Sequence, residues 1–180
     1  MEFKGITHNL FVFVPQLLFL VAVIGGVVFA LVMGIRVLRR SNSDSKKAII
    51  ASVLCVLIQG TSWFLNMGWF RFIMTFMLIP VIHVVVLFIT NIFAAKRFNE
   101  SKKLKIMNLF FMITFLLCYI FLPDGGDYGE MYFFFGLIKS NVLSRIAEYI
   151  AEVAFIVHFV LFILQIVEMV KLKKLRELNK

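Results

Sequence analysis

Long apolar runs alternate with short polar connections along this chain. A bilayer has a hydrocarbon core about 30 Å thick, which a helix of roughly 20 apolar residues can cross. Runs of about that length predict five spanning helices, at residues 10–35, 48–67, 72–95, 106–122 and 146–170. The expected fold class is all-α: a polytopic transmembrane helical bundle that forms a single domain over residues 1–180.

Local features refine these helices at three positions. Pro123 ends the short fourth run, and Pro80 is expected to bend the third helix just before His83. Arg71 lies in the tight connection between the second and third runs, next to aromatic residues. We expect Arg71 at the level of the lipid headgroups, where such residues anchor a membrane protein.

Basic residues gather in three connections. The segments 36–47, 96–105 and 171–180 each contain five of the chain's 19 Lys and Arg residues. Five alternating spans place all three segments on one side of the membrane, and cytoplasmic segments carry such an excess. The pattern therefore predicts an N-terminus outside and a C-terminus inside. Residue usage that is rich in Lys, Ile and Phe favours the plasma membrane of a bacterium.

Composition supports lipid as the solvent of this chain. It is 62% hydrophobic and 16% charged, whereas soluble domains are about 45–50% apolar and about 25% charged. A soluble fold of this size would leave too much apolar surface in water. The net charge of +9 predicts attraction to anionic lipids at the cytoplasmic face. It does not indicate nucleic-acid binding, because the basic residues lie in short connections between apolar runs.

The connection 123–145 contains two smaller features. Residues 131–138 are apolar but too few to cross a bilayer, so they are expected to lie in the interface or to re-enter the bundle. Before them, Asp124, Asp127 and Glu130 recur at every third residue with glycines between them. Their oxygens could form an outer-loop Ca²⁺ site, although the spacing is not that of an EF-hand, and a solvated turn is the alternative.

Small residues follow one face of the first predicted helix. In lipid, small residues and polar contacts hold helices together, because apolar side chains gain nothing over lipid tails. The first helix carries a ladder of small residues four positions apart, namely Ala22, Gly26, Ala30 and Gly34. This ladder predicts close packing against another helix, in the same chain, in a second copy or in a different membrane protein.

Strongly polar side chains fall on single stripes of the other helices. They are Gln59 and Asn66 in the second, His83 in the third, and His158 and Gln165 in the fifth. Gln59, His83 and His158 are expected near the bilayer midplane. Burying such groups without partners costs several kcal/mol each, so we expect them to meet one another or backbone carbonyls. They either fix the helix register or form a functional site, since intramembrane ionisable groups mark pathways and proton relays.

Motifs of known enzymes are missing from the sequence. There is no phosphate-binding glycine loop, zinc-protease motif or nucleophile elbow, and neither a catalytic residue nor a metal site is predicted. The first hypothesis is a non-enzymatic accessory, regulatory or immunity-type subunit that acts through helix–helix contacts with a membrane-protein partner or a second copy. One alternative is a small transporter or ion-conducting protein with a path along Gln59, His83, His158 and Gln165. Another is an intramembrane protein with a b-type haem, the one cofactor considered, on His83 and His158.

Overall fold

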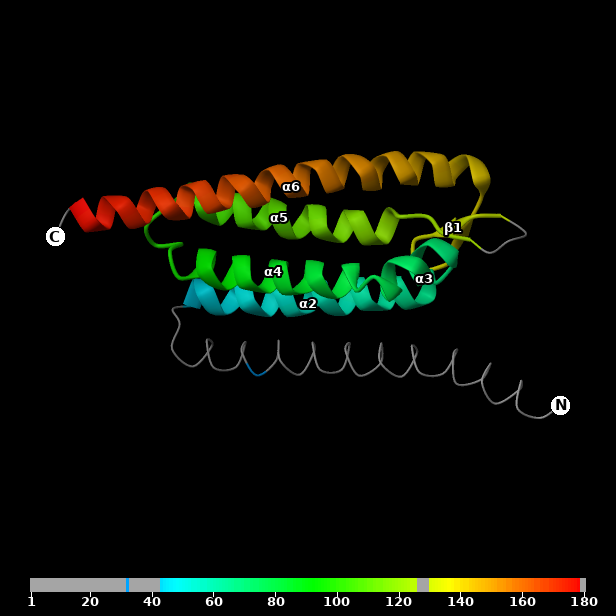
Figure 1. The fold of residues 1–180 in the computed structure, drawn as a ribbon, viewed down its shortest axis with the longest axis horizontal. Coiled ribbons are helices and arrows are strands. Elements are labelled where there is room, and N and C mark those ends of the chain that lie inside the picture. The colour runs from blue at the N-terminus through cyan, green and yellow to red at the C-terminus, as the bar shows by residue number, and fades with distance from the viewer. Residues whose placement is uncertain (1–31, 33–42, 126–129, 179–180) are drawn as a thin grey trace.

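The computed structural model describes residues 32, 43–125 and 130–178 of the chain. Their helices are α2 (Ser43–Leu65), α3 (Trp69–Phe76), α4 (Ile79–Ala95), α5 (Lys102–Phe121) and α6 (Asn141–Leu178) (Figure 1). Two short strands, β1 (Tyr132–Phe133) and β2 (Ile138–Lys139), form an antiparallel hairpin. Apart from Val32, the first predicted span and its ladder of Ala22, Gly26, Ala30 and Gly34 lie outside the described residues.

The described helices match the second to fifth predicted runs. Three of them, α2, α5 and α6, are long and apolar enough to cross a membrane. The pair α3 and α4 makes a fourth candidate, bent by 66° at a short break. Helix α6 has 38 residues, about 57 Å at the helical rise, so it exceeds the roughly 30 Å hydrocarbon core. Figure 1 shows its C-terminal end projecting past the other helices.

The bend between α3 and α4 follows from Pro80. Proline lacks a backbone N–H and its ring clashes with the preceding turn, so a helix cannot run through it undisturbed. The chain therefore breaks at Met77 and Leu78, where Leu78 has a left-handed φ of 58°. Helix α4 then restarts with Pro80 in its first turn, where the missing donor costs nothing. The predicted bend before His83 is confirmed.

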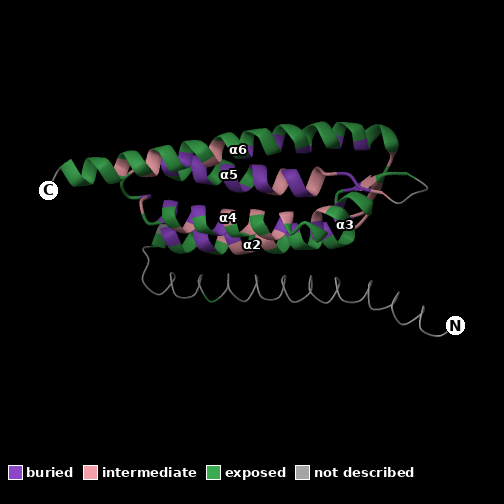
Figure 2. Ribbon diagram, in the orientation of Figure 1, coloured by how far each residue is buried: buried purple, intermediate pink, exposed green. Residues whose placement is uncertain are grey.

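The helices pack in two close pairs. Helix α5 packs along α6, and α2 packs against α4 and also against α5 (Figure 1). The apolar core between them includes Trp63, Leu87, Phe111 and Phe115. Figure 2 shows α6 exposed over most of its length. Its buried positions form one stripe, which consists of Ser144, Ala147, Ala151, Ala154, His158 and Gln165. The exposed apolar remainder of α6 suits a lipid solvent.

The strands close one end of the bundle, which we call the hairpin end (residues 66–71, 122–125 and 130–140). The expectation for residues 131–138 was an interfacial or re-entrant segment of an all-α fold, and the structure instead forms β1 and β2 there. The chain turns back at Phe134, Phe135 and Gly136, whose positive φ values of 50°, 62° and 73° do not fit a right-handed helix. Its backbone finds partners elsewhere: Tyr132 exchanges two hydrogen bonds with Asp124, and the Phe134 N–H donates to the Ile120 carbonyl at 3.1 Å.

Candidate functional site

The two histidines of the predicted spans meet in the middle of the bundle. His83 of α4 and His158 of α6 lie edge to face, with ring centroids 4.7 Å apart. The Phe115 ring of α5 packs against both, at 4.9 Å from His83 and 5.9 Å from His158. Phe111 stacks on His158 at 4.0 Å. His158 is buried and His83 is half-buried, so three helices enclose the pair.

Helix α5 holds each imidazole by its Nδ1 atom. The Nδ1 atom of His158 lies 3.0 Å from the Phe111 carbonyl oxygen and 3.2 Å from Thr114 Oγ1. A carbonyl oxygen only accepts, so Nδ1 of His158 carries the hydrogen and Nε2 is the free acceptor of the neutral ring. The Nδ1 atom of His83 lies 2.8 Å from the Tyr119 hydroxyl. A hydroxyl both donates and accepts, so that bond can reverse its direction.

Tyr119 connects this pair to the hairpin end. The Trp63 ring lies edge-on to the Tyr119 ring at 5.5 Å, and Trp63 Nε1 donates to Thr75 Oγ1 at 2.8 Å. The guanidinium of Arg71 sits over the Trp63 ring, with Cζ 5.1 Å from the centroid. Contact is therefore unbroken from Arg71 through Trp63 and Tyr119 to the two histidines.

Arg71 is fully buried, contrary to its expected place among the lipid headgroups. Its guanidinium donates to three backbone carbonyl oxygens, at 2.8 Å to Ser62, 2.9 Å to Tyr119 and 2.6 Å to Leu122. The Tyr119 and Leu122 carbonyls lie at the C-terminal end of α5, where carbonyls lack intrahelical partners, and the forked guanidinium binds both of them at once. This arrangement compensates for the loss of water around the charge.

Asp124 supplies the matching negative charge without touching the guanidinium of Arg71. Its carboxylate accepts from the backbone N–H groups at the start of α3, at 3.1 Å from Gly68, 3.2 Å from Phe70 and 2.7 Å from Arg71. It also accepts from the Gly125 N–H at 2.8 Å. A carboxylate at a helix N-terminus satisfies orphan donors and complements the helix dipole. The hairpin end is thus locked by one buried acid and one buried base.

Of the three residues predicted to form an outer-loop cation site, Asp124 has other partners in the structure. The Asp124 oxygens are engaged with backbone N–H groups, Glu130 is exposed, and Asp127 lies outside the described residues. Among the residues that the structure describes, no three His, Cys, Asp or Glu side chains are grouped to hold a metal ion. The neighbouring Tyr132 hydroxyl donates to the Met67 carbonyl at 2.7 Å, and burial raises the pKa of Tyr132.

A b-type haem does not fit between His83 and His158 as they lie. Two axial imidazoles that each bind iron at about 2 Å have ring centres roughly 6 Å apart, with the porphyrin between them. The ring centroids here are 4.7 Å apart and the rings touch edge to face.

The three predicted amide residues are buried away from the histidine pair. Asn66 Nδ2 donates to Ser62 Oγ at 3.3 Å, and Gln165 Nε2 donates to the Met107 carbonyl at 3.3 Å. Gln59 is buried on α2. Within the described ranges, no hydrogen bond joins these three side chains to the imidazoles. The structure therefore brings His83 and His158 together and joins none of the three amides to them by a hydrogen bond among the described residues.

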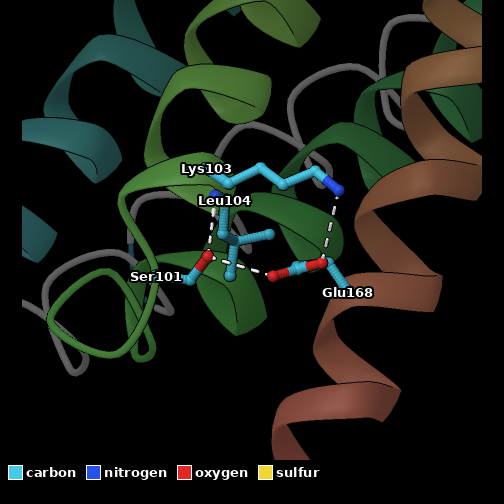
Figure 3. A network of polar contacts seen from close by, with 4 residues as sticks. All are labelled: Ser101, Lys103, Leu104 and Glu168. Atoms are coloured by element: carbon cyan, nitrogen blue, oxygen red, sulfur yellow. Dashed lines mark hydrogen bonds and ion pairs between the residues drawn. The ribbon is translucent and has the colours of Figure 1, made fainter.

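At the opposite end of the bundle, the connection between α4 and α5 clamps α6 (Figure 3). We call this the loop end (residues 96–103 and the facing part of α6). Ser101 Oγ donates to Glu168 Oε1 at 3.1 Å and accepts from the Leu104 N–H at 3.2 Å, which caps α5. Lys103 Nζ lies 3.6 Å from Glu168 Oε2. Arg97 also donates to the Met169 carbonyl, and Arg176 pairs with Glu100.

Sequence reasoning missed the contribution of α5. Asn108, Phe111, Phe115 and Tyr119 recur at helical spacing and are all buried, a pattern that marks one face of a helix. The polar side chains of the fourth run therefore carried a readable signal for Tyr119. The pairing of Asp124 with the start of α3 left no signal in the sequence, because the two positions are far apart in the chain.

The chain matches no protein-family model, no curated protein and no solved structure. Its function has to be inferred from the chemistry of the bundle. That chemistry centres on three titratable side chains from three helices, in which His83 contacts both Tyr119 and His158. We refer to these residues as the core triad.

Proposed function

We propose that this chain is a small ion-conducting membrane protein that takes up protons at the core triad and passes them along the helical bundle. The observation that carries this proposal is the direct contact between His83 and His158, with centroids 4.7 Å apart. Each ring also has one nitrogen bonded to a group of α5. An imidazole can accept a proton at one nitrogen and release it from the other, which suits a relay.

The cost of burial supports a functional role for the triad. A purely structural contact between helices needs only neutral hydroxyl or amide groups, which bind one another at about 0.6 kcal/mol per contact in membranes. Two imidazoles add a property that those groups lack, because each can take up a proton and the first to be protonated repels a proton from the second. At 4.7 Å this repulsion is about 3–4 kcal/mol for an effective dielectric constant near 20. Such groups inside a membrane point to pathways and relays.

The packing around the triad favours the proton over larger ions. Aromatic rings of Phe111, Phe115 and Trp63 fill the space next to it. A hydrated metal ion needs an open channel, whereas a proton moves through hydrogen bonds between packed groups.

This proposal includes a location and an orientation. The hairpin end faces the outside and the loop end faces the cytoplasm, in the plasma membrane of a bacterium. Support comes from the basic residues of the loop end and of the projecting part of α6, namely Lys96, Arg97, Lys102, Lys103, Lys171, Lys173, Lys174 and Arg176. Cytoplasmic surfaces carry such an excess, and anionic lipid headgroups are the partners that it attracts.

Proton flux into vesicles tests the function. We expect purified protein in vesicles of phosphatidylcholine and phosphatidylglycerol, loaded with a pH-sensitive dye, to dissipate an imposed pH gradient. His83→Gln and His158→Gln should each lower that flux by at least about tenfold, because a positioned proton-transfer group contributes roughly 10²–10⁴-fold. Tyr119→Phe removes the hydroxyl bonded to His83 and should have a similar effect.

Tyr149→Phe is the matched control for Tyr119→Phe. Tyr149 lies on the exposed side of α6, so its hydroxyl can be removed without touching the triad. Flux should be unchanged in Tyr149→Phe, and circular dichroism should show that every variant keeps its helix content. Wild-type flux in well-folded His83→Gln and His158→Gln proteins would rule out the relay.

A groove on the lipid-facing side favours a second candidate, an accessory subunit that acts through helix–helix contacts. The groove has a volume of about 470 Å³ and lies between α5 and α6. Its lining includes Thr114, Leu117, Ile150, Val153, Ala154 and Val157. Small and polar residues among them, such as Ala154 and Thr114, allow a helix of a partner or a second copy to approach closely. A photocrosslinker at Val153 would then capture that helix in native membranes.

A further inference from the structure

In the described part of the chain, α6 carries no polar side chain that joins the core triad directly to the loop end. On the α6 face that carries His158, the next polar residue is Gln165, seven residues further on, or about 10 Å at the helical rise. Residues 159–164 between them are all apolar. A proton that reaches His158 therefore needs another carrier before it can leave the bundle on this side.

Three amide oxygens without donors lie beyond this gap. They are Asn91 Oδ1 of α4, Asn108 Oδ1 of α5 and Gln165 Oε1 of α6, and in the described part of the chain no group donates to them. The three residues are at most 1% exposed. A buried acceptor without a donor costs about 1–3 kcal/mol. Turning an amide by 180° exchanges its oxygen and nitrogen, so one end of each stays without a partner either way.

These amides are tied to one another through α5. Gln165 Nε2 donates to the carbonyl of Met107, the residue before Asn108. Asn91 Nδ2 donates to Ser52 Oγ at 2.6 Å, and Ser52 Oγ lies 3.9 Å from Sδ of Met112. Met112 is one turn from Asn108 on the same face of α5. Contacts with residues 107–112 of α5 therefore place all three amides between the core triad and the loop end.

We infer that this amide set binds internal water, which carries protons between His158 and Glu168. The inference rests on the proposed function. A buried water typically makes about three hydrogen bonds to polar groups that lack partners, and each orphan oxygen here can accept one. Neutral amide oxygens suit water better than a metal ion, because no carboxylate in the set would balance an ionic charge.

The proposed transfer ends at Glu168. Glu168 lies one turn beyond Gln165 on the same face of α6, and its side chain is 13% exposed beside Ser101 and Lys103 (Figure 3). Protonated His158 gives up the hydrogen of one N–H bond to the nearest water, and the water chain delivers one proton to the Glu168 carboxylate. Glu168 then loses that proton to the solution at the loop end, so no proton is gained or lost overall.

Two buried methionines provide a test that does not depend on flux. Met107 and Met112 flank Asn108 and both are buried. X-ray radiolysis turns bound water into hydroxyl radicals, which oxidise adjacent methionines. In bilayers, we expect Met107 and Met112 of the intact protein to be oxidised several times faster than half-buried Met74 of the apolar core, as measured by mass spectrometry.

Substitution of the amides tests whether the oxidation of Met107 and Met112, which we call the footprint, depends on the orphan oxygens. Asn108→Leu and Gln165→Leu remove orphan oxygens and should each lower the oxidation of Met107 and Met112 about threefold or more. Asn66→Leu changes a buried amide at the hairpin end and should leave the oxidation rates of Met107 and Met112 unchanged. Should a leucine variant misfold, Gln165→Met, which keeps the length of the side chain, gives the same readout.

The outcomes separate this inference from the proposed function. Oxidation of Met107 and Met112 no faster than that of Met74, or an unchanged rate in both Asn108→Leu and Gln165→Leu, overturns the water site, even if the histidine variants abolish flux. The water site is also overturned if the oxidation of Met107 and Met112 disappears when potassium in the buffer is exchanged for sodium. That result would show that a metal ion, and not water, binds the amides. Support requires the amide-dependent footprint together with a loss of flux of about tenfold in Glu168→Gln.

Discussion

Replacing Asp124 with alanine is expected to lower the free energy of unfolding by about 3–5 kcal/mol, the cost of leaving one buried charge without its partner. The substitution removes the acceptor for four backbone N–H groups, those of Gly68, Phe70, Arg71 and Gly125. It also leaves the buried guanidinium of Arg71 without a nearby negative charge. Denaturant unfolding in detergent micelles, followed by circular dichroism, measures the change.

Two further substitutions separate charge from hydrogen bonding. Asp124→Asn keeps one acceptor oxygen but removes the charge, so its loss of stability should lie between those of Asp124→Ala and the unchanged protein. Glu130→Ala is the matched control, because Glu130 is exposed and such changes usually stay within about 0.5 kcal/mol. Equal stability of Asp124→Ala and Glu130→Ala would show that the buried cap does not hold the hairpin end.

Gly68→Ala is expected to cost about 1–3 kcal/mol, the usual range for an overpacked site. A Cβ atom at Gly68 would lie 2.4 Å from Asp124 Oδ1 and 2.5 Å from the Gly125 carbonyl oxygen. Both distances are far below van der Waals contact, and the second neighbour is backbone. The substitution therefore pushes Asp124 off the start of α3. The melting temperature in micelles should fall accordingly.

Gly60→Ala is the control of opposite sign. Gly60 lies within α2, and a Cβ atom there meets no atom within 4 Å. Alanine favours a helix over glycine by about 0.5–1 kcal/mol, so Gly60→Ala should raise the melting temperature. A fall of the same size in Gly60→Ala and Gly68→Ala would mean that the close approach to Asp124 does not limit residue 68.

Periodicity and run length made the helices predictable from sequence. Apolar runs gave the C-terminal ends of α2, α4 and α5 to within about two residues, because long apolar runs can be located directly in the sequence. Pro80 gave the bend between α3 and α4, because its effect on a helix is local. The basic and apolar residues of 167–178 alternate at helical spacing and predict a helical continuation of the fifth run, and α6 extends to Leu178.

Contacts between residues that are far apart in the chain could not be predicted from the sequence. Arg71 and Asp124 each flank an apolar run, and each alone is most simply placed in water. Only the fold brings the Asp124 carboxylate to the start of α3 and the Arg71 guanidinium to the carbonyls of Ser62, Tyr119 and Leu122. The hairpin of β1 and β2 depends on the same contacts, and no local pattern contains them.

The number of residues from the end of each predicted span indicated the level of the two histidines in the bundle, but it did not indicate their partners. His83 and His158 were expected near the same level, and the structure places them in contact. Which nitrogen each ring uses depends on Tyr119 and Phe111 of α5. The distance between the rings also decides against a haem, and separations of that kind come only from the packed bundle.

Histidine protonation in bilayers tests the central claim most directly. Solid-state NMR of protein labelled with ¹⁵N-histidine, recorded at falling pH, distinguishes neutral from protonated rings, and His8→Gln removes the third histidine from the spectrum. We predict that His83 and His158 take up one proton between them as a coupled pair, and that Tyr119→Phe alters the form of His83. Rings that both stay neutral until the protein unfolds, or that protonate independently of each other, would contradict the account.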